Sequence, residues 1–223
     1  MKKARVFGVI ALVCLCIAAV FLLDTPTYIK VWRGQEQNLA EIDPYELKKG
    51  DVVSGDAGWS YGYCAEEYQT NFGIRTSKDS TKRYYVMLLN SDDFILYCTS
   101  VKSEYTQLDK MEDELIAYYD SWERYEESED PEDLKIPEST IDIQGSVTKI
   151  PSEIEGYFRE WYAECVGDDY NESVVPLMIN HMNFDSFGTM MIAGIAAAVG
   201  AVIFGILALV MRIKAKKSEF DFY

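Results

Sequence analysis

The sequence predicts a small α+β domain inserted between two transmembrane helices, and three observations support this prediction. Two apolar segments without a charged residue, 6–23 and 189–211, lie near the two ends of the 223-residue chain. Of the 37 acidic residues, 35 lie between these segments. The intervening region combines runs of β-branched and aromatic residues, typical of strands, with two stretches of helical periodicity.

The apolar segments are long enough to cross a bilayer. A spanning helix needs about 20 apolar residues, because backbone polar groups cannot stay unpaired in hydrocarbon. The two segments have 18 and 23 residues. We therefore expect an N-terminal tail at 1–5, a span at 6–23, a domain at 24–188, a second span at 189–211 and a C-terminal tail at 212–223.

A cleaved signal peptide is the alternative interpretation of the first segment, because Lys2 and Lys3 precede it. Its 18 apolar residues exceed the usual apolar length of about 7–15 in such peptides. The sequence also has no small-x-small cleavage motif near Leu23. An uncleaved anchor is therefore expected.

Charge predicts the orientation, because Lys and Arg next to a span stay in the cytoplasm. Seven basic residues flank the spans at the chain ends: Lys2, Lys3, Arg5, Arg212, Lys214, Lys216 and Lys217. A multi-pass plasma-membrane protein with both termini in the cytoplasm is expected. The outer domain carries 14 basic against 35 acidic residues, a formal charge of −21. That charge repels nucleic acid, so the expected partners are the lipid bilayer and an unidentified protein.

The first half of the domain is predicted to be mostly β. Strands are expected at 28–32, 51–58, 59–69, 83–89 and 93–101, with a Gly-rich turn between the second and third. The turn residues after Leu89 favour a hairpin between the last two strands. The final strand has apolar side chains on both faces, so it should be central in its sheet.

The second half predicts two helices around one more strand. A capping-box pattern begins a helix at Thr106, with apolar residues at three- and four-residue steps as far as Tyr125. A polar linker is expected at 126–140 and a strand at 141–150. A second helix should begin at Ser152 and end at Gly167.

Five or so short strands with two helices favour a small antiparallel, OB-like β-barrel, with a different α+β sheet as the alternative. The aromatic residues of the domain matter for function. A concave aromatic groove near Trp59 would point to ligand binding, whereas a convex surface would favour a scaffolding role.

Two stretches carry a resemblance to a known family. Residues 41–53, EIDPYELKKGDVV, and 141–147, IDIQGSV, resemble uncharacterised two-span membrane proteins of Gram-positive bacteria. The resemblance extends over the whole order of span, domain and span. It implies a bacterial cell membrane and no assigned activity.

Residues 58–62, GWSYG, match the G-x-S-x-G pattern of the hydrolase nucleophile elbow. That motif needs a strand, a sharp turn and an apolar helix, and the residues after it are not an apolar helix. The sole histidine, His181, is the only base of the usual kind. A surface serine hydrolase using Ser60 is the enzymatic alternative, but an aromatic strand is preferred and no catalytic residue is assigned.

His181 itself is interpreted as an interfacial residue in an amphipathic lead-in to the second span. A pH sensor is the alternative, since histidine titrates near neutrality. Acidic clusters at 112–114, 126–133 and 168–169 raise the possibility of a Ca²⁺-dependent adhesion or sensor domain. None of them has EF-hand spacing, so no metal ligand and no cofactor is assigned.

Three cysteines lie in the domain. Cys64 and Cys98 fall on strands expected to be neighbours, so they are a candidate disulfide in an oxidising compartment. Cys165 lies on the apolar stripe of a predicted helix and should be buried.

The second span carries a stripe of small residues. Ala193, Ala197, Ala201 and Gly205 recur at every fourth position, and Gly8 offers a small residue on the first span. Such stripes let two membrane helices approach closely. We expect the two spans to pair within one molecule. The expected function is a membrane-anchored module that presents its acidic domain to a protein or envelope component, without a catalytic role.

Overall fold

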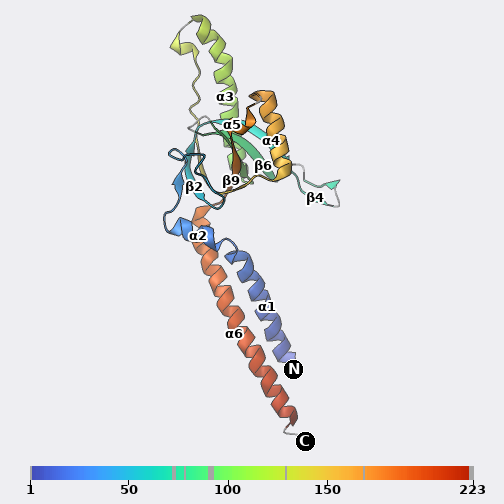
Figure 1. Ribbon diagram of the computed structural model, residues 1–223. Helices are drawn as coiled ribbons and strands as arrows, with labels where there is room; N and C mark the ends of the chain where they lie inside the picture. The colour runs from blue at the N-terminus through green and yellow to red at the C-terminus, as the bar shows by residue number, and fades with distance from the viewer. Residues whose placement is uncertain are drawn as a thin grey trace. The chain divides into compact units, whose positions relative to one another are not determined.

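The computed structural model describes residues 2–71, 74–77, 79–89, 93–128, 130–167 and 169–220. The chain divides into two compact units. One consists of Met1–Arg33 together with Phe184–Tyr223, and the other is Gly34–Asn183. Helices and a large sheet occur together, which confirms the α+β class (Figure 1).

The first unit is helical and contains α1 (Lys2–Leu22) and α6 (Phe187–Phe220). These two helices lie side by side (Figure 1). The stretches Ala4–Leu22 and Phe184–Ala215 are long and apolar enough to cross a membrane. This finding rests on length and composition.

The two long helices approach each other closely near Gly194. A Cβ atom at Gly194 would lie 2.8 Å from Cδ2 of Leu22 and 3.1 Å from Cβ of Phe21. Further along the pair, the rings of Phe7 and Phe204 stack with centroids 6.1 Å apart. These contacts set the two helices antiparallel, as a hairpin.

Only some residues of the predicted small-residue stripe lie in the contact between α1 and α6. Ala197, Ala201 and Gly205 are half-buried, whereas Ala193 is exposed. A Cβ atom at Gly205 or at Gly8 would meet nothing within 4 Å. The contact surface follows the three- and four-residue steps from Gly194, as expected for two packed helices.

The predicted strand at 28–32 is wrong, because this segment belongs to helix α2 (Thr25–Trp32). A proline in the first helical turn favours this start, since its missing N–H has no partner to lose there. The Thr25 hydroxyl also donates a hydrogen bond of 2.6 Å to the Leu22 carbonyl. Tyr28 is buried, and its ring lies 4.5 Å from that of Phe187 near the start of α6.

The second unit contains a mixed seven-stranded sheet with the order β1-β2-β8-β9-β7-β6-β3. The pairs β1–β2 and β7–β9 are parallel and the other neighbours are antiparallel. The predicted antiparallel OB-like barrel is therefore wrong. The strands are β1 (Gln37–Asn38), β2 (Val52–Ala57), β3 (Ser60–Glu67), β6 (Lys82–Leu88), β7 (Phe94–Thr99), β8 (Ile141–Lys149) and β9 (Val174–His181), with β4 (Thr70–Asn71) and β5 (Ile74–Arg75) forming a separate pair.

Strand β9 is the element that changes the topology. It lies between β8 and β7 in the sheet. From the sequence, this segment is expected to be an amphipathic lead-in to the second span. Proline cannot donate a ladder hydrogen bond, so Pro176 argues against an inner strand. The structure accommodates it at an irregularity, because the β7–β9 register shifts between the pairs Phe94–Val174 and Leu96–Met178.

Two local predictions are confirmed. Strands β6 and β7 pair antiparallel, with Leu88 opposite Phe94. All six residues of β7 are buried, and the strand lies inside the sheet. In contrast, β2 and β3 follow each other in the sequence but do not pair. Strand β3 ends one edge of the sheet, and β2 lies near the other.

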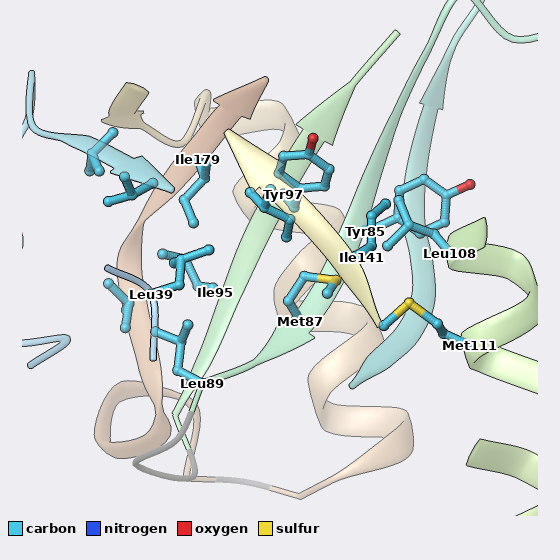
Figure 2. Packing of buried hydrophobic residues seen from close by; sticks show 14 of the residues in the cluster. Leu39, Tyr85, Met87, Leu89, Ile95, Tyr97, Leu108, Met111, Ile141 and Ile179 are labelled. Carbon is cyan, nitrogen blue, oxygen red and sulfur yellow. The ribbon is translucent and has the colours of Figure 1, made fainter. Parts of the chain in front are cut away.

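One face of the sheet packs against α3 (Lys102–Ser128). The buried side chains of this first core come from the sheet, the β1–β2 region and the N-terminal half of α3 (Figure 2). Its largest fully buried members include Tyr85, Tyr97, Met87 and Leu108. The helix begins at Lys102, one turn before the predicted cap at Thr106.

The opposite face packs against α4 (Ser152–Cys165). The second core combines Phe158 and Tyr162 of this helix with Leu96 and Val86 of the sheet. The predicted helix start is confirmed. So is the stop at Gly167, whose N–H donates to the Tyr162 carbonyl at 3.0 Å with a φ of +144°.

The polar linker predicted at 126–140 is partly helical, because α3 continues to Ser128 and a 3₁₀ turn, η1, spans Pro131–Asp133. The chain then returns along α3. Glu114 fixes this return, since its carboxylate accepts hydrogen bonds from the Ser139 N–H at 2.9 Å and the Ser139 hydroxyl at 2.6 Å. These bonds lower the pKa of Glu114 to about 2. A short helix, α5 (Tyr170–Ser173), leads into β9.

Candidate functional site

A cavity of about 600 Å³ opens beside the connection between β2 and β3. Pockets for small ligands are usually about 300–1,000 Å³ and mostly apolar, with a few polar groups. The lining residues come from the residue after β1, from β2, β3 and their connection, from the end of β6, and from the second half of α3: Leu39, Asp56, Ala57, Gly58, Trp59, Tyr61, Leu88, Leu89, Tyr118, Tyr119 and Trp122. We call this site the aromatic groove.

Five aromatic rings form the walls of the aromatic groove. Trp59 meets Tyr118 edge to face with centroids 5.8 Å apart. Tyr118 also lies 5.5 Å from Tyr119 and 5.8 Å from Trp122. The fifth ring is Tyr61, whose hydroxyl lies 3.2 Å from the Tyr119 hydroxyl. This bond joins strand β3 to helix α3 across the site.

Local sequence explains why these rings gather here. Trp59 lies in the two-residue connection between β2 and β3, and its side chain is half-buried. Tyr118 and Trp122 are four residues apart on α3, so they share one face of the helix. The buried apolar residues of α3 extend through Leu115, and Trp122 remains 39% exposed beyond it. The apolar stripe of α3 thus continues past its contact with the sheet.

The floor of the aromatic groove is part of the buried core. Leu39 and Leu89 belong to the first core and are 4% and 7% exposed (Figure 2). The walls differ from this floor, because Tyr119 is 52% exposed. A buried apolar floor with exposed aromatic walls is the arrangement expected of a ligand pocket.

The polar groups of the aromatic groove are acidic or neutral. Asp56 supplies the one carboxylate among the lining residues that the structure describes, and no Lys, Arg or His is among them. Next to the site, the Trp122 indole N–H donates to Glu126 Oε1 at 2.8 Å. The groove therefore combines aromatic rings with negative charge.

Ser60 lies next to the groove, and its surroundings differ from those of a nucleophile elbow. Its Oγ is fully buried and makes no hydrogen bond within the described part of the chain. Ser60 opens strand β3 instead of a helix, so the elbow geometry is missing. His181 lies on β9, three strands from β3, which corresponds to about 14 Å. The structure does not bring the two residues together.

His181 ends strand β9 and has partners in the first core. Its Nδ1 lies 3.0 Å from Glu104 Oε1 and 2.8 Å from the hydroxyl of the buried Tyr97. The Tyr97 hydroxyl donates to Glu104 Oε2 at 2.8 Å. Burial raises the pKa of Glu104, but hydrogen bonds, above all from His181, outweigh that effect and lower it. The interpretation of His181 as a lead-in residue is wrong, because it joins β9 to α3.

A second polar cluster surrounds Arg83 on β6. Its guanidinium pairs with Glu66 at 2.7 Å and with Asp109 of α3 at 2.9 Å. The same group lies over the rings of Tyr63 and Tyr105, at 4.5 Å and 4.8 Å from their centroids. Two carboxylates and two rings thus saturate this cation, and the cluster holds α3 on the sheet.

The acidic stretches do not converge in the described residues, where no group of three His, Cys, Asp or Glu could hold a metal ion. In the 112–114 stretch, the Glu112 carboxyl packs over Gly62, while Glu114 binds the Ser139 segment. Burial raises the pKa of Glu112. Asp168, from the third stretch, lies outside the described residues.

The cysteines are free thiols in the structure. Cys64 on β3 and Cys98 on β7 are not on neighbouring strands, because β6 lies between them. Strands two places apart are separated by about 9.5 Å, more than the Cα distance of about 7 Å that a disulfide spans. Burial raises the pKa of Cys64 to about 12. Cys165 is exposed, contrary to the predicted burial.

The fold and the groove together define a class of protein. In the sequence, two apolar helices, each long enough to cross a membrane, flank an acidic α+β domain with an aromatic groove. A family model matches residues 1–214, so the chain belongs to the family described as a domain of unknown function, DUF8577. No curated protein and no solved structure shows a significant match to the chain.

The sequence pointed to one wall of the site. It indicates the surroundings of Trp59 as the place where a groove would point to ligand binding. The rings of α3 follow the apolar stripe of a helix, a pattern that predicts core positions for all of them. The length of the stripe is the feature that could have indicated exposed rings. It continues for about two turns beyond Leu115, the last core residue on that face.

Proposed function

We propose that this chain is a two-span membrane protein that presents its acidic domain outside the cytoplasm as a binding module. Its partner is a protein or another component of the cell envelope, and the module has no catalytic role. The observation that carries the proposal is the aromatic groove, because exposed aromatic side chains in a preformed pocket are typical of binding sites.

The basic flanks of the spans support the orientation. Arg5 and Arg212 border the same groove between α1 and α6, at the end of the helical hairpin near both chain termini. Basic residues next to spans stay in the cytoplasm, which supports a domain on the other side of the membrane. The resemblance of residues 41–53 and 141–147 to two-span proteins of Gram-positive bacteria supports a bacterial plasma membrane.

The binding role is tested by photo-crosslinking in intact cells of the native host. The change Tyr119→p-benzoylphenylalanine places the reactive group in the aromatic groove, and the same change at Tyr157 serves as the matched control. Tyr119 and Tyr157 are both about half exposed, at 52% and 47%. We expect a discrete higher-mass adduct from position 119 and none from position 157. Equal adducts from both positions, or none from either, would refute the proposed binding surface.

The orientation is tested with the native thiols. Cys165 is exposed in the domain, whereas Cys98 is buried. We expect a membrane-impermeant maleimide to label intact cells and the change Cys165→Ser to abolish most of that labelling. Labelling that appears only after the cells are permeabilised would place the domain in the cytoplasm.

A further inference from the structure

The chemistry of the aromatic groove indicates what kind of group enters it. Aromatic faces carry a negative quadrupole, so they attract cations, and quaternary ammonium groups are bound in cages of several rings. Trp59, Tyr118 and Trp122 follow one another around the groove at centroid distances of 5.8 Å. Tyr119 and Tyr61 close the same wall through their hydroxyl contact.

Charge favours a cation over a neutral ligand. The Asp56 carboxylate lines the groove, and no basic side chain among the described lining residues competes for the rings. The Trp122 indole donates to the Glu126 carboxylate, which increases the electron density of the ring system. The whole segment between the spans has a formal charge of −21, so its field attracts cations and repels anions.

The same features argue against an inorganic cation. Ca²⁺ takes six to eight oxygen ligands, and the groove offers one carboxylate among aromatic and aliphatic side chains. An organic cation differs, because its methyl or methylene groups pack on rings while its charge needs few oxygens. The cavity of about 600 Å³ has room for such a group together with part of the molecule that carries it.

We propose that the aromatic groove binds a quaternary ammonium group carried by an envelope component. This inference rests on the proposed function, because it names the chemistry of the partner of that module. The exposed rings of Tyr119 and Trp122 leave the groove open to a group carried on a larger molecule. Asp56 provides the counter-charge, and the rings provide the contact surface.

The test uses choline as the probe and full-length protein in a maltoside detergent, which has no ammonium headgroup. Binding is followed by calorimetry and by tryptophan fluorescence. The neutral isostere 3,3-dimethylbutan-1-ol has the same shape without the charge. We expect saturable choline binding and at least tenfold weaker binding of the isostere. Equal binding of the two compounds, or no saturable choline binding, would overturn the inference.

Variants connect the binding to the groove. Trp122→Leu keeps an apolar side chain but removes the ring, and Asp56→Asn removes the charge. Each should weaken choline binding by about tenfold. Tyr157→Leu on α4, away from the groove, is the control and should leave binding unchanged. If all three variants bound choline as tightly as the unaltered protein, choline would bind elsewhere and the assignment would be overturned.

A final arm separates this inference from the proposed function. Excess choline, but not the isostere, should suppress the adduct formed from position 119 in intact cells. An adduct that choline leaves untouched would mean that the module binds its partner without an ammonium group, so only this inference would fail. Absence of any adduct would instead count against the proposed function, whatever choline does to the purified protein.

Discussion

Replacing Phe158 by Ala should lower the free energy of unfolding by about 3–5 kcal/mol, the usual cost of emptying the space of a buried phenylalanine. Phe158 is fully buried in the second core, against the sheet. Its ring lies 5.5 Å from the ring of Tyr170 and 6.2 Å from that of Trp161. Removing the ring takes contacts from both aromatic neighbours and leaves a cavity that a packed helix cannot close.

The neighbouring residue provides the control. Tyr157 is 47% exposed, so Tyr157→Ala should change the free energy of unfolding by no more than about 0.5 kcal/mol. Urea denaturation of the full-length protein in detergent, followed by near-UV circular dichroism, measures both changes. Similar losses from the two variants would mean that α4 does not cover the second face of the sheet.

The parts of the fold that follow local rules could be predicted from the sequence. Helix α4 begins after Pro151 and ends at Cys165, just before Gly167. Both signals, the proline and the glycine, lie within a few residues of the boundaries that they set. The β6–β7 hairpin depends on a short connection between two strand-like runs. The central position of β7 follows from its apolar residues on both faces.

The sheet order could not be predicted, because it depends on pairings between distant segments. Strand β9 pairs in parallel with β7, about 80 residues earlier in the chain. Pro176 argues against an inner strand, so the sequence does not indicate a strand at this position. Likewise, β2 and β3 are adjacent in the sequence but belong to different parts of the sheet. A hydrophobic pattern identifies which residues are buried, but it does not identify which strand lies beside them.

The aromatic groove illustrates the same limit. The rings of α3 satisfy the helical periodicity of a buried face, and the first part of that face is indeed buried at Leu108 and Met111. Trp122 is 39% exposed and lines the aromatic groove, so the same pattern forms a core at one end and a groove wall at the other. Which of the two a given turn forms depends on what packs against it, a non-local property.

Gly145 gives the sharpest test of the sheet order. It lies on β8, opposite His181 of β9 and opposite Val53 of β2. A Cβ atom at Gly145 would lie 2.6 Å from the carbonyl oxygen of Asn180 and 2.6 Å from Cγ2 of Ile179. The first of these is a backbone atom of β9, which cannot turn aside as a side chain can.

We therefore expect Gly145→Ala to destabilise the protein by about 1–3 kcal/mol, as for overpacking in a well-packed core. Gly156→Ala is the matched control, because Gly156 lies inside α4 with nothing within 4 Å of its Cβ position. Alanine suits a helix better than glycine, so this change should stabilise the protein by about 0.5–1 kcal/mol. Urea denaturation measures both. The opposite signs depend on β9 lying against β8. A neutral or stabilising Gly145→Ala would mean that β9 does not lie beside β8, and the mixed sheet order would then be wrong.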